Sequence, residues 1–169
     1  NDSAFLINTN WYSDNKIQIG TQFLKLKNSF AATRNITKFV LFDIIEGDLN
    51  AALTQPESIA LSQTEAIRLF GSNKAIGKTF IDKGNNKTWT VSAIFADMPQ
   101  NSHFDFRSLV SSQPYKNVIG NGAHIYLSTL KNVDLTQIEN AATQIFADIW
   151  HWKNIQYQLQ PITDIHLGE

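Results

Sequence analysis

Residues 57–80 read ESIALSQTEAIRLFGSNKAIGKTF, and they carry the clearest local signals in the chain. Residues 57–61 are typical of a short strand, and residues 62–70 of a helix with both ends marked. Ser62 and Glu65 predict a capping box, in which each side chain accepts a hydrogen bond from the other residue's amide. Gly71 predicts the left-handed residue that ends the helix. The residues spaced to share the buried face of this helix are Ala66, Ile67 and Phe70.

The end of the same stretch is close in spelling to the Gly-Lys-Thr of a phosphate-binding P-loop. The P-loop pattern is G-x-x-x-x-G-K-[ST], but here the first position holds Ser72, and Gly71 is one residue too early. A P-loop also leaves a strand and enters a helix, whose N-terminal dipole attracts phosphate. This segment leaves a predicted helix and enters a predicted strand, and a helix C-terminus repels anions. We therefore predict that this turn does not bind a nucleotide.

Strand signals surround this stretch. Residues 4–12 and 16–27 are rich in β-branched and aromatic side chains. Residues 78–82 and 87–95 predict a hairpin in which Gly84-Asn85 forms a tight primed turn. Residues 37–49 fit either a short helix or a strand that runs into a turn at Gly47-Asp48, because periodicity does not separate the two in so short an apolar run.

The C-terminal part has the longest predicted helix. Residues 120–132 predict a strand between turn residues, and residues 134–150 a helix capped by Asp134, with Gln137 completing a variant of the capping box. Residues 155–160 alternate as a half-exposed strand that Pro161 ends. The apolar stripe of the helix consists of Leu135, Ile138, Ala142, Ile145, Phe146 and Ile149. Together the elements predict an α+β domain with antiparallel hairpins and two main helices.

Composition limits the classes of function. The chain has 169 residues, 43% hydrophobic and 17% charged, which is typical of one soluble globular domain or two small lobes. Its net charge is -1 without a basic stripe, so nucleic acid is not an expected partner. The absence of cysteine excludes disulfides, thiolate metal sites and cysteine nucleophiles. The apolar runs are too short to span a bilayer, and the start without methionine leads us to expect a piece of a longer chain.

A search for reactive side chains gives weak candidates. Three ligands, His103 with Asp97 and Asp105, could hold a metal, but turn capping and packing explain them better. His151 between Trp150 and Trp152 fits core packing at a helix end better than a ligand cage. We also considered His124 and His166, the acidic turn Asp43, Glu46 and Asp48, and the Asn-x-Ser/Thr triplets at Asn1, Asn35 and Asn86. We therefore predict no catalytic, metal or cofactor-binding residues and no cofactor; the residues of any partner surface stay unknown.

Five motifs in order resemble one family. They are EGDL (46–49), ESIALSQTEAIRLFG (57–71), AIGKTF (75–80), WTVSAIFADMPQNSHFDF (89–106) and PITDIHL (161–167). This order resembles the MacB-like periplasmic core domain of FtsX-type ABC transporter permeases. The resemblance covers residues 38–169 and is densest over residues 46–106.

The resemblance implies a two-lobed domain on the periplasmic side of the bacterial cytoplasmic membrane. Residues 1–51 and 122–169 would form a porter-like lobe, and residues 52–121 an inserted β-rich lobe. The domain would lie between the first two transmembrane helices of its permease and would not be an enzyme. It would couple cytoplasmic ATP hydrolysis to movement outside the membrane, for export or signalling.

The resemblance also implies partners: a second permease copy, a cytoplasmic ATP-binding subunit or domain, and in some systems a periplasmic adaptor protein. The excised domain is predicted to be a monomer. One alternative is a domain that senses a small ligand through Trp89, Trp150 and Trp152. A hydrolase that uses His103 or Asp105 is a more remote alternative.

Overall fold

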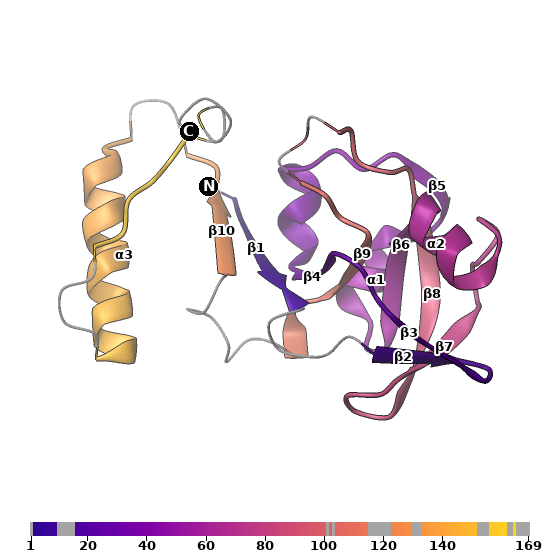
Figure 1. The fold of residues 1–169 in the computed structure, drawn as a ribbon. Helices are drawn as coiled ribbons and strands as arrows, with labels where there is room; N and C mark the ends of the chain where they lie inside the picture. The colour runs from indigo at the N-terminus through magenta and orange to yellow at the C-terminus, as the bar shows by residue number, and fades with distance from the viewer. Residues whose placement is uncertain are drawn as a thin grey trace. The chain divides into compact units, whose positions relative to one another are not determined.

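The structure, a computed structural model, describes residues 2–9, 16–100, 102, 104–114, 123–129, 133–151, 156–161 and 164. The chain divides into two compact units, Asn1–Ser128 (unit 1) and Thr129–Glu169 (unit 2). Unit 1 holds the sheet and the short helices, and unit 2 holds one long helix (Figure 1). This division leaves the predicted lobes untested, so their boundaries remain a prediction.

The described residues of unit 1 form a ten-stranded mixed sheet. Its strands lie in the order β10–β1–β4–β9–β6–β8–β7–β2–β3, and β5 also pairs with β8. The β4–β9 and β6–β8 pairs are parallel and the others antiparallel. The strands are β1 (Ser3–Asn8), β2 (Lys16–Ile19), β3 (Gln22–Lys25), β4 (Ser29–Ala32), β5 (Ile44–Gly47), β6 (Ser58–Ser62), β7 (Thr79–Asp82), β8 (Lys87–Phe95), β9 (Ser108–Ser111) and β10 (Ala123–Leu127).

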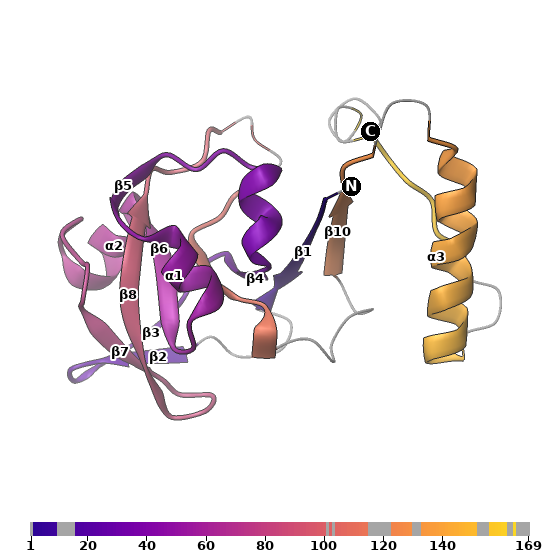
Figure 2. The ribbon, with the colours of Figure 1, turned by 180° about the vertical axis from the view of Figure 1, so that it is seen from behind.

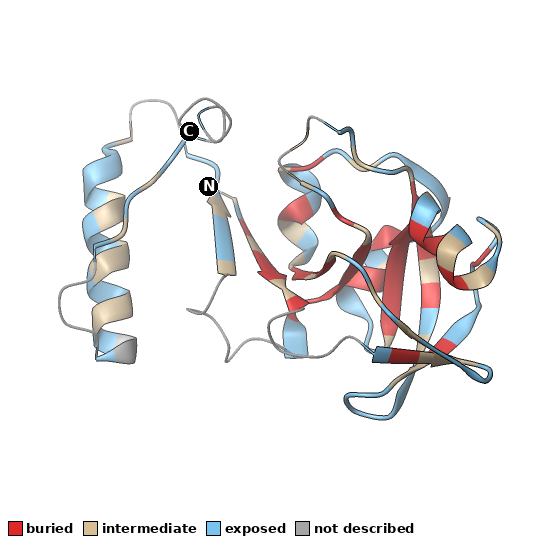
Figure 3. Cartoon of the chain, in the orientation of Figure 1, coloured by how far each residue is buried: buried red, intermediate tan, exposed pale blue. Residues whose placement is uncertain are grey.

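Each face of this sheet carries its own hydrophobic core. Neighbouring residues of a strand point to opposite faces, so Ala31 belongs to one core and Ala32 to the other. The short helices η2 (Arg34–Lys38) and α1 (Leu49–Thr54) cover the first core, and α2 (Gln63–Phe70) covers the second. Figure 2 shows α1 in front of the sheet, where Figure 1 shows it behind. Strands β6 and β9 are buried throughout, as the red segments of Figure 3 show.

The sheet curls at strand β8. Strand β7 pairs with Lys87–Thr90 of β8, while β5 pairs with Ala93–Phe95, so both lie along the same edge of β8. The register shifts in both the β5–β8 and the β6–β8 pairs, and such bulges bend a strand and increase its twist. The β7–β2–β3 end of the sheet is thereby turned out of line with β6 (Figure 1).

Several sequence predictions are confirmed here: the α+β class, helix 62–70 with its left-handed Gly71 at φ 71°, and the 79–95 hairpin. Others are wrong. Residues 16–27 form the two strands β2 and β3, because Gly20 adopts φ 57° and reverses the chain. Gly84-Asn85 is not a tight primed turn, because residues 83–86 form a longer loop in which Asn86 has φ 58°.

Within residues 37–49, residues 44–47 form β5, which ends at Gly47, so the strand alternative is confirmed; η2 ends at Lys38 and α1 begins at Leu49. Within the predicted strand 120–132, residues 123–127 form β10. Strand β9 was not predicted, because its four residues lack a clear period.

Unit 2 contains α3 (Leu135–Trp150), which begins at Asp134 as predicted. Asp134 accepts the Thr136 amide hydrogen bond at 3.0 Å, a simple N-cap. The described residues 156–160 are not a strand, contrary to prediction. Side chains of α3 instead accept hydrogen bonds from the backbone of this segment. Thr143 Oγ1 accepts from Tyr157 N at 3.0 Å, and Glu139 Oε1 accepts from Leu159 N at 2.8 Å. The rings of Phe146 and Tyr157 stack 4.6 Å apart.

Two glycines with positive φ provide a matched test of the fold. A Cβ at Gly47 would lie 2.2 Å from the Ser92 backbone oxygen, whereas one at Gly71 would meet nothing within 4 Å. Gly71→Ala should therefore cost only the left-handed backbone penalty, about 1 kcal/mol. Gly47→Ala adds a backbone clash that separates β5 from β8, and should cost about 3 kcal/mol. Urea unfolding of both variants measures the difference; equal costs would contradict this packing of β5.

Candidate functional site

The N-terminus of α2 is capped, but only half of the predicted capping box forms. Ser62 Oγ accepts from the Glu65 amide at 3.3 Å, as predicted. The Ser62 amide donates instead to the Arg107 carbonyl at 2.9 Å. The predicted buried face is also partly wrong, because Ile67 is 47% exposed and the buried positions are Glu65, Ala66 and Leu69.

Glu65 is a fully buried carboxylate held by a guanidinium. Arg68 Nε and Nη2 donate to the two Glu65 oxygens at 2.7 and 2.6 Å, and the Lys27 amide donates at 3.1 Å. Arg68 Nη2 also donates to the Lys25 carbonyl at 2.6 Å. Hydrogen bonding to Glu65 raises the pKa of Arg68 above its ordinary value, despite the opposing effect of burial. This pair therefore ties α2 to the end of strand β3, a role that sequence reasoning missed although the i,i+3 spacing indicates it.

Asp97 supplies a second cap to α2 from a distant part of the chain. Its carboxylate accepts from Thr64 Oγ1 at 2.6 Å and from Thr64 N at 3.3 Å. Burial alone would raise the pKa of Asp97, but the hydrogen bonds from Thr64 and Ser62 and the charge of Arg107 lower it below its ordinary value. Asp97 is thus occupied in fixing the helix.

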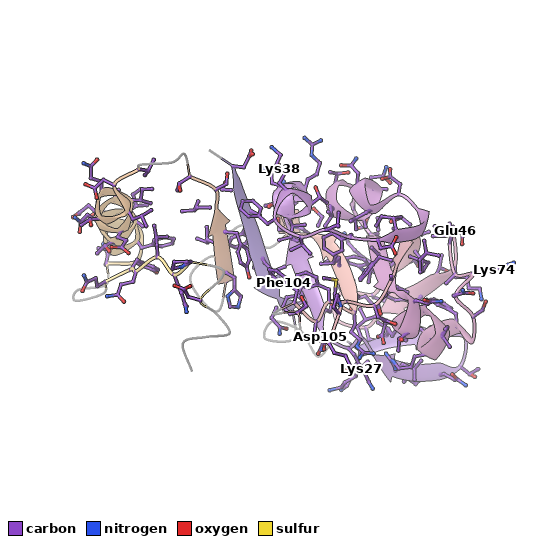
Figure 4. The ribbon with its side chains drawn as sticks, turned by 90° about the horizontal axis from the view of Figure 1, so that it is seen from above. Lys27, Lys38, Glu46, Lys74, Phe104 and Asp105 are labelled. Atoms are coloured by element: carbon purple, nitrogen blue, oxygen red, sulfur yellow. The ribbon has the colours of Figure 1, made fainter. Side chains whose placement is uncertain are left out.

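The proposed metal ligands are not assembled within the described residues. Asp105 accepts a hydrogen bond from the Asn28 side chain and lies 3.7 Å from Arg107 Nε, and Asn28 O binds the Arg107 amide at 3.1 Å. His103 lies outside the described residues. No group of three or more metal-ligating side chains occurs in the part of the chain that the structure describes. Figure 4 shows Asp105 on the same side of unit 1 as Lys27.

Backbone amides of the P-loop-like turn donate hydrogen bonds to carbonyls of the protein itself. Gly71 N donates to Ile67 O at 2.8 Å, Gly77 N to Val91 O at 2.9 Å and Lys78 N to Ala75 O at 3.0 Å. The segment runs from α2 into β7, so the predicted order of helix and then strand is confirmed. Lys78 Nζ lies 5.4 Å from the centre of the Phe70 ring. These amides are therefore not aimed at a common ligand.

The remaining candidates are scattered. Asp48 caps α1 by accepting from the Asn50 amide at 2.8 Å, and the Asn35 side chain donates to Ser3 O at 3.1 Å. His124 and His151 are exposed. Trp89 Nε1 is buried without a hydrogen-bond partner among the described residues. Asn1, Trp152, His166 and the side chain of Trp150 lie outside the description, so a tryptophan-lined pocket stays untested.

The described residues instead present two exposed surfaces of opposite charge. The first, the basic face, consists of Lys16, Gln18, Phe23, Lys25, Ile81 and Lys83 on strands β3, β2 and β7 and the residue after β7. The second, the acidic ribbon, consists of residues 41–48 along β5 and carries Asp43, Glu46 and Asp48. Phe23 is 67% exposed and Leu41 94%, the two highest values among the large apolar side chains described.

None of the helices in the described residues has both the length and the apolar character needed to cross a membrane. No protein-family model matches the sequence. A search of curated proteins also finds no match.

Solved structures do match the fold. A domain assigned to a permease protein from Porphyromonas gingivalis matches with TM-score 0.66 and 17% identity, over 88% of this chain and 70% of that one. The periplasmic region of MacB from Actinobacillus actinomycetemcomitans matches with TM-score 0.63 and 12% identity, over 98% and 91%. The extracellular domain of the noncanonic ABC-type transporter YknZ from Gram-positive bacteria matches with TM-score 0.61 and 13% identity, over 86% and 75%. The resemblance predicted from the motifs is therefore confirmed at the level of the fold.

The buried ion pair predicts a large effect of Arg68→Met. The Glu65 carboxylate has a side-chain exposure of 0%, so it would lose its counter-charge without gaining water. We expect a loss of about 3 kcal/mol in the free energy of unfolding, and a Glu65→Gln/Arg68→Met double variant that loses less than the sum of the single changes. Lys87→Met is the control, because its pair with Glu57 is exposed and should be worth less than about 1 kcal/mol. Equal losses for Arg68→Met and Lys87→Met would refute the role of the buried pair.

We expect Asp97 to contribute to the free energy of unfolding in a pH-dependent way. Because the folded-state pKa of Asp97 lies below its ordinary value of 3.8, the ionised group stabilises the fold at neutral pH. That contribution is lost as the pH falls through the folded-state value. Asp97→Ala should therefore cost about 1 kcal/mol at pH 7, and the cost should shrink as the pH drops below 3.8. Unfolding curves across this range, with Asp43→Ala as the exposed control, measure it; a cost independent of pH would contradict the capping role.

Proposed function

We propose that this chain is a non-catalytic extracytoplasmic domain of an ABC transporter permease. The observation that carries the proposal is the fold: three domains described as periplasmic, extracellular or permease-derived match 86–98% of the chain. These neighbours belong to transporters rather than to enzymes. The hydrogen bonds of Asp97, Asp105 and Glu65 support the proposal, because they commit these carboxylates to structure.

In this proposal the domain transmits movement. A cytoplasmic ATP-binding subunit or domain would hydrolyse ATP, the membrane helices of the parent permease would move, and the domain would carry that movement to a substrate or a partner outside. Two hydrophobic cores on one sheet suit such a role, because close-packed interiors deform little and pass strain on. A second permease copy would be present, and in some systems an adaptor protein outside the membrane.

The location can be tested with cysteine labelling, because this part of the protein has no cysteine of its own. Lys74→Cys places a thiol at an exposed position, and Ala60→Cys places one at a position with 0% exposure. In the intact host, we expect a membrane-impermeant maleimide to label Lys74→Cys of the parent protein and not Ala60→Cys. Labelling of Lys74→Cys only after lysis would place the domain in the cytoplasm and overturn the proposal.

A further inference from the structure

The basic face owes its charge to strand register. Lys16 lies directly opposite Lys25, and Lys83 N donates to Lys16 O at 2.9 Å, which places the three lysines in one row across β3, β2 and the end of β7. The next row holds Phe23, Gln18 and Ile81. Ile17 and Leu24 point to the other side, into the core. Like charges placed side by side on a sheet repel one another, so this row attracts anionic groups.

The face lacks acidic groups among the described residues. Asp82 pairs with Ile17 and so lies on the core side, where its carboxylate accepts from the Gly84 amide at 2.8 Å. Neither Lys25 nor Lys83 has an ion pair within the part of the chain that the structure describes. The free edge of β3 is a poorer docking site than its face, because Arg68 already occupies the Lys25 carbonyl and Glu65 the Lys27 amide.

The acidic ribbon has the complementary character. It carries three carboxylates beside Leu41, Ile44 and Ile45, which are 94%, 38% and 45% exposed. Both surfaces therefore carry exposed apolar side chains, and their charges are of opposite sign.

The two surfaces are connected through strand β8. Strands β5 and β7 pair with opposite ends of the same edge of β8, so the acidic ribbon and the β7 end of the basic face adjoin one strand. Where a two-fold axis relates two copies, a contact between one basic face and the other copy's acidic ribbon occurs twice.

We propose that the basic face docks on the acidic ribbon of a second copy of this chain. The inference deepens the proposed function, on which it rests, by naming the surfaces through which two permease copies meet outside the membrane. Lysines are under-represented in strong protein interfaces, so the contact is weak. The isolated chain would be monomeric at low concentration, and shared membrane anchoring would raise the effective concentration to about the millimolar range.

Charge exchange tests the inference without identifying any other partner. One variant, Lys25→Glu/Lys83→Glu, makes the basic face acidic, and the other, Asp43→Lys/Glu46→Lys, makes the ribbon basic. Each variant alone has two like-charged surfaces, whereas an equimolar mixture restores two attractive contacts. Sedimentation velocity over a concentration series at low salt should show weak association of the natural chain and of the mixture. For each variant alone the dissociation constant should rise at least tenfold, a change of about 1.4 kcal/mol.

Cross-linking locates the contact. Phe23→Cys and Leu41→Cys, each the only cysteine in its chain, should form a mixed disulfide in preference to either homodimer. Arg34→Glu reverses an exposed charge on η2 and should leave association unchanged. Association of a variant as strong as that of the natural chain, or a mixture that stays monomeric, would overturn the inference. Salt-sensitive binding of the natural chain to anionic vesicles without self-association would overturn it in favour of a lipid surface.

Discussion

Unit 1 depends on one buried charge. Glu65 lies on α2 without contact with water, and its carboxylate is neutralised by Arg68 and bound by the Lys27 amide. Arg68 in turn reaches the Lys25 carbonyl at the end of β3, the last strand in the sheet order. A buried carboxylate is costly unless it is fully paired. The requirement to pair it therefore fixes where the curled end of the sheet meets the helix, and it covers part of the β3 edge that would otherwise attract foreign strands.

The loop carboxylates that were candidates for a reactive site also stabilise the fold. Asp97 caps α2, Asp48 caps α1 and Asp105 binds the Asn28 side chain. Carboxylates that accept hydrogen bonds from helix amides hold the ends of elements in place. The two carboxylates of the motif ADMPQNSHFDF, Asp97 and Asp105, therefore both have structural roles.

Hydrophobic cores cover both faces of the central strands, so the surfaces open to partners lie on the outer strands. The central strands β6 and β9 are buried, whereas β2, β3 and β5 carry the exposed apolar and charged side chains. The fold is shared, at only 12–17% identity, with a domain assigned to a permease, with the periplasmic region of MacB and with the extracellular domain of YknZ. At that distance the shared feature is the architecture.

The sequence by itself determined the elements whose signals are local: the Ser62 cap, the left-handed Gly71, the 79–95 hairpin and helix α3. Each is specified by hydrogen bonds or periodicity within a short segment, so the local sequence pattern predicts it. Tertiary structure alone decided that Glu65 turns to Arg68 and Lys27 rather than to the Ser62 amide, that Asp97 binds Thr64, and that β9 joins β4 to β6. It also decided that Lys25, Lys16 and Lys83 share one row, because that follows from a turn at Gly20 and from strand register. Apart from the Glu65–Arg68 pair, these contacts join residues that are not neighbours in the chain, and their choice rests on burial and register, which no local pattern encodes.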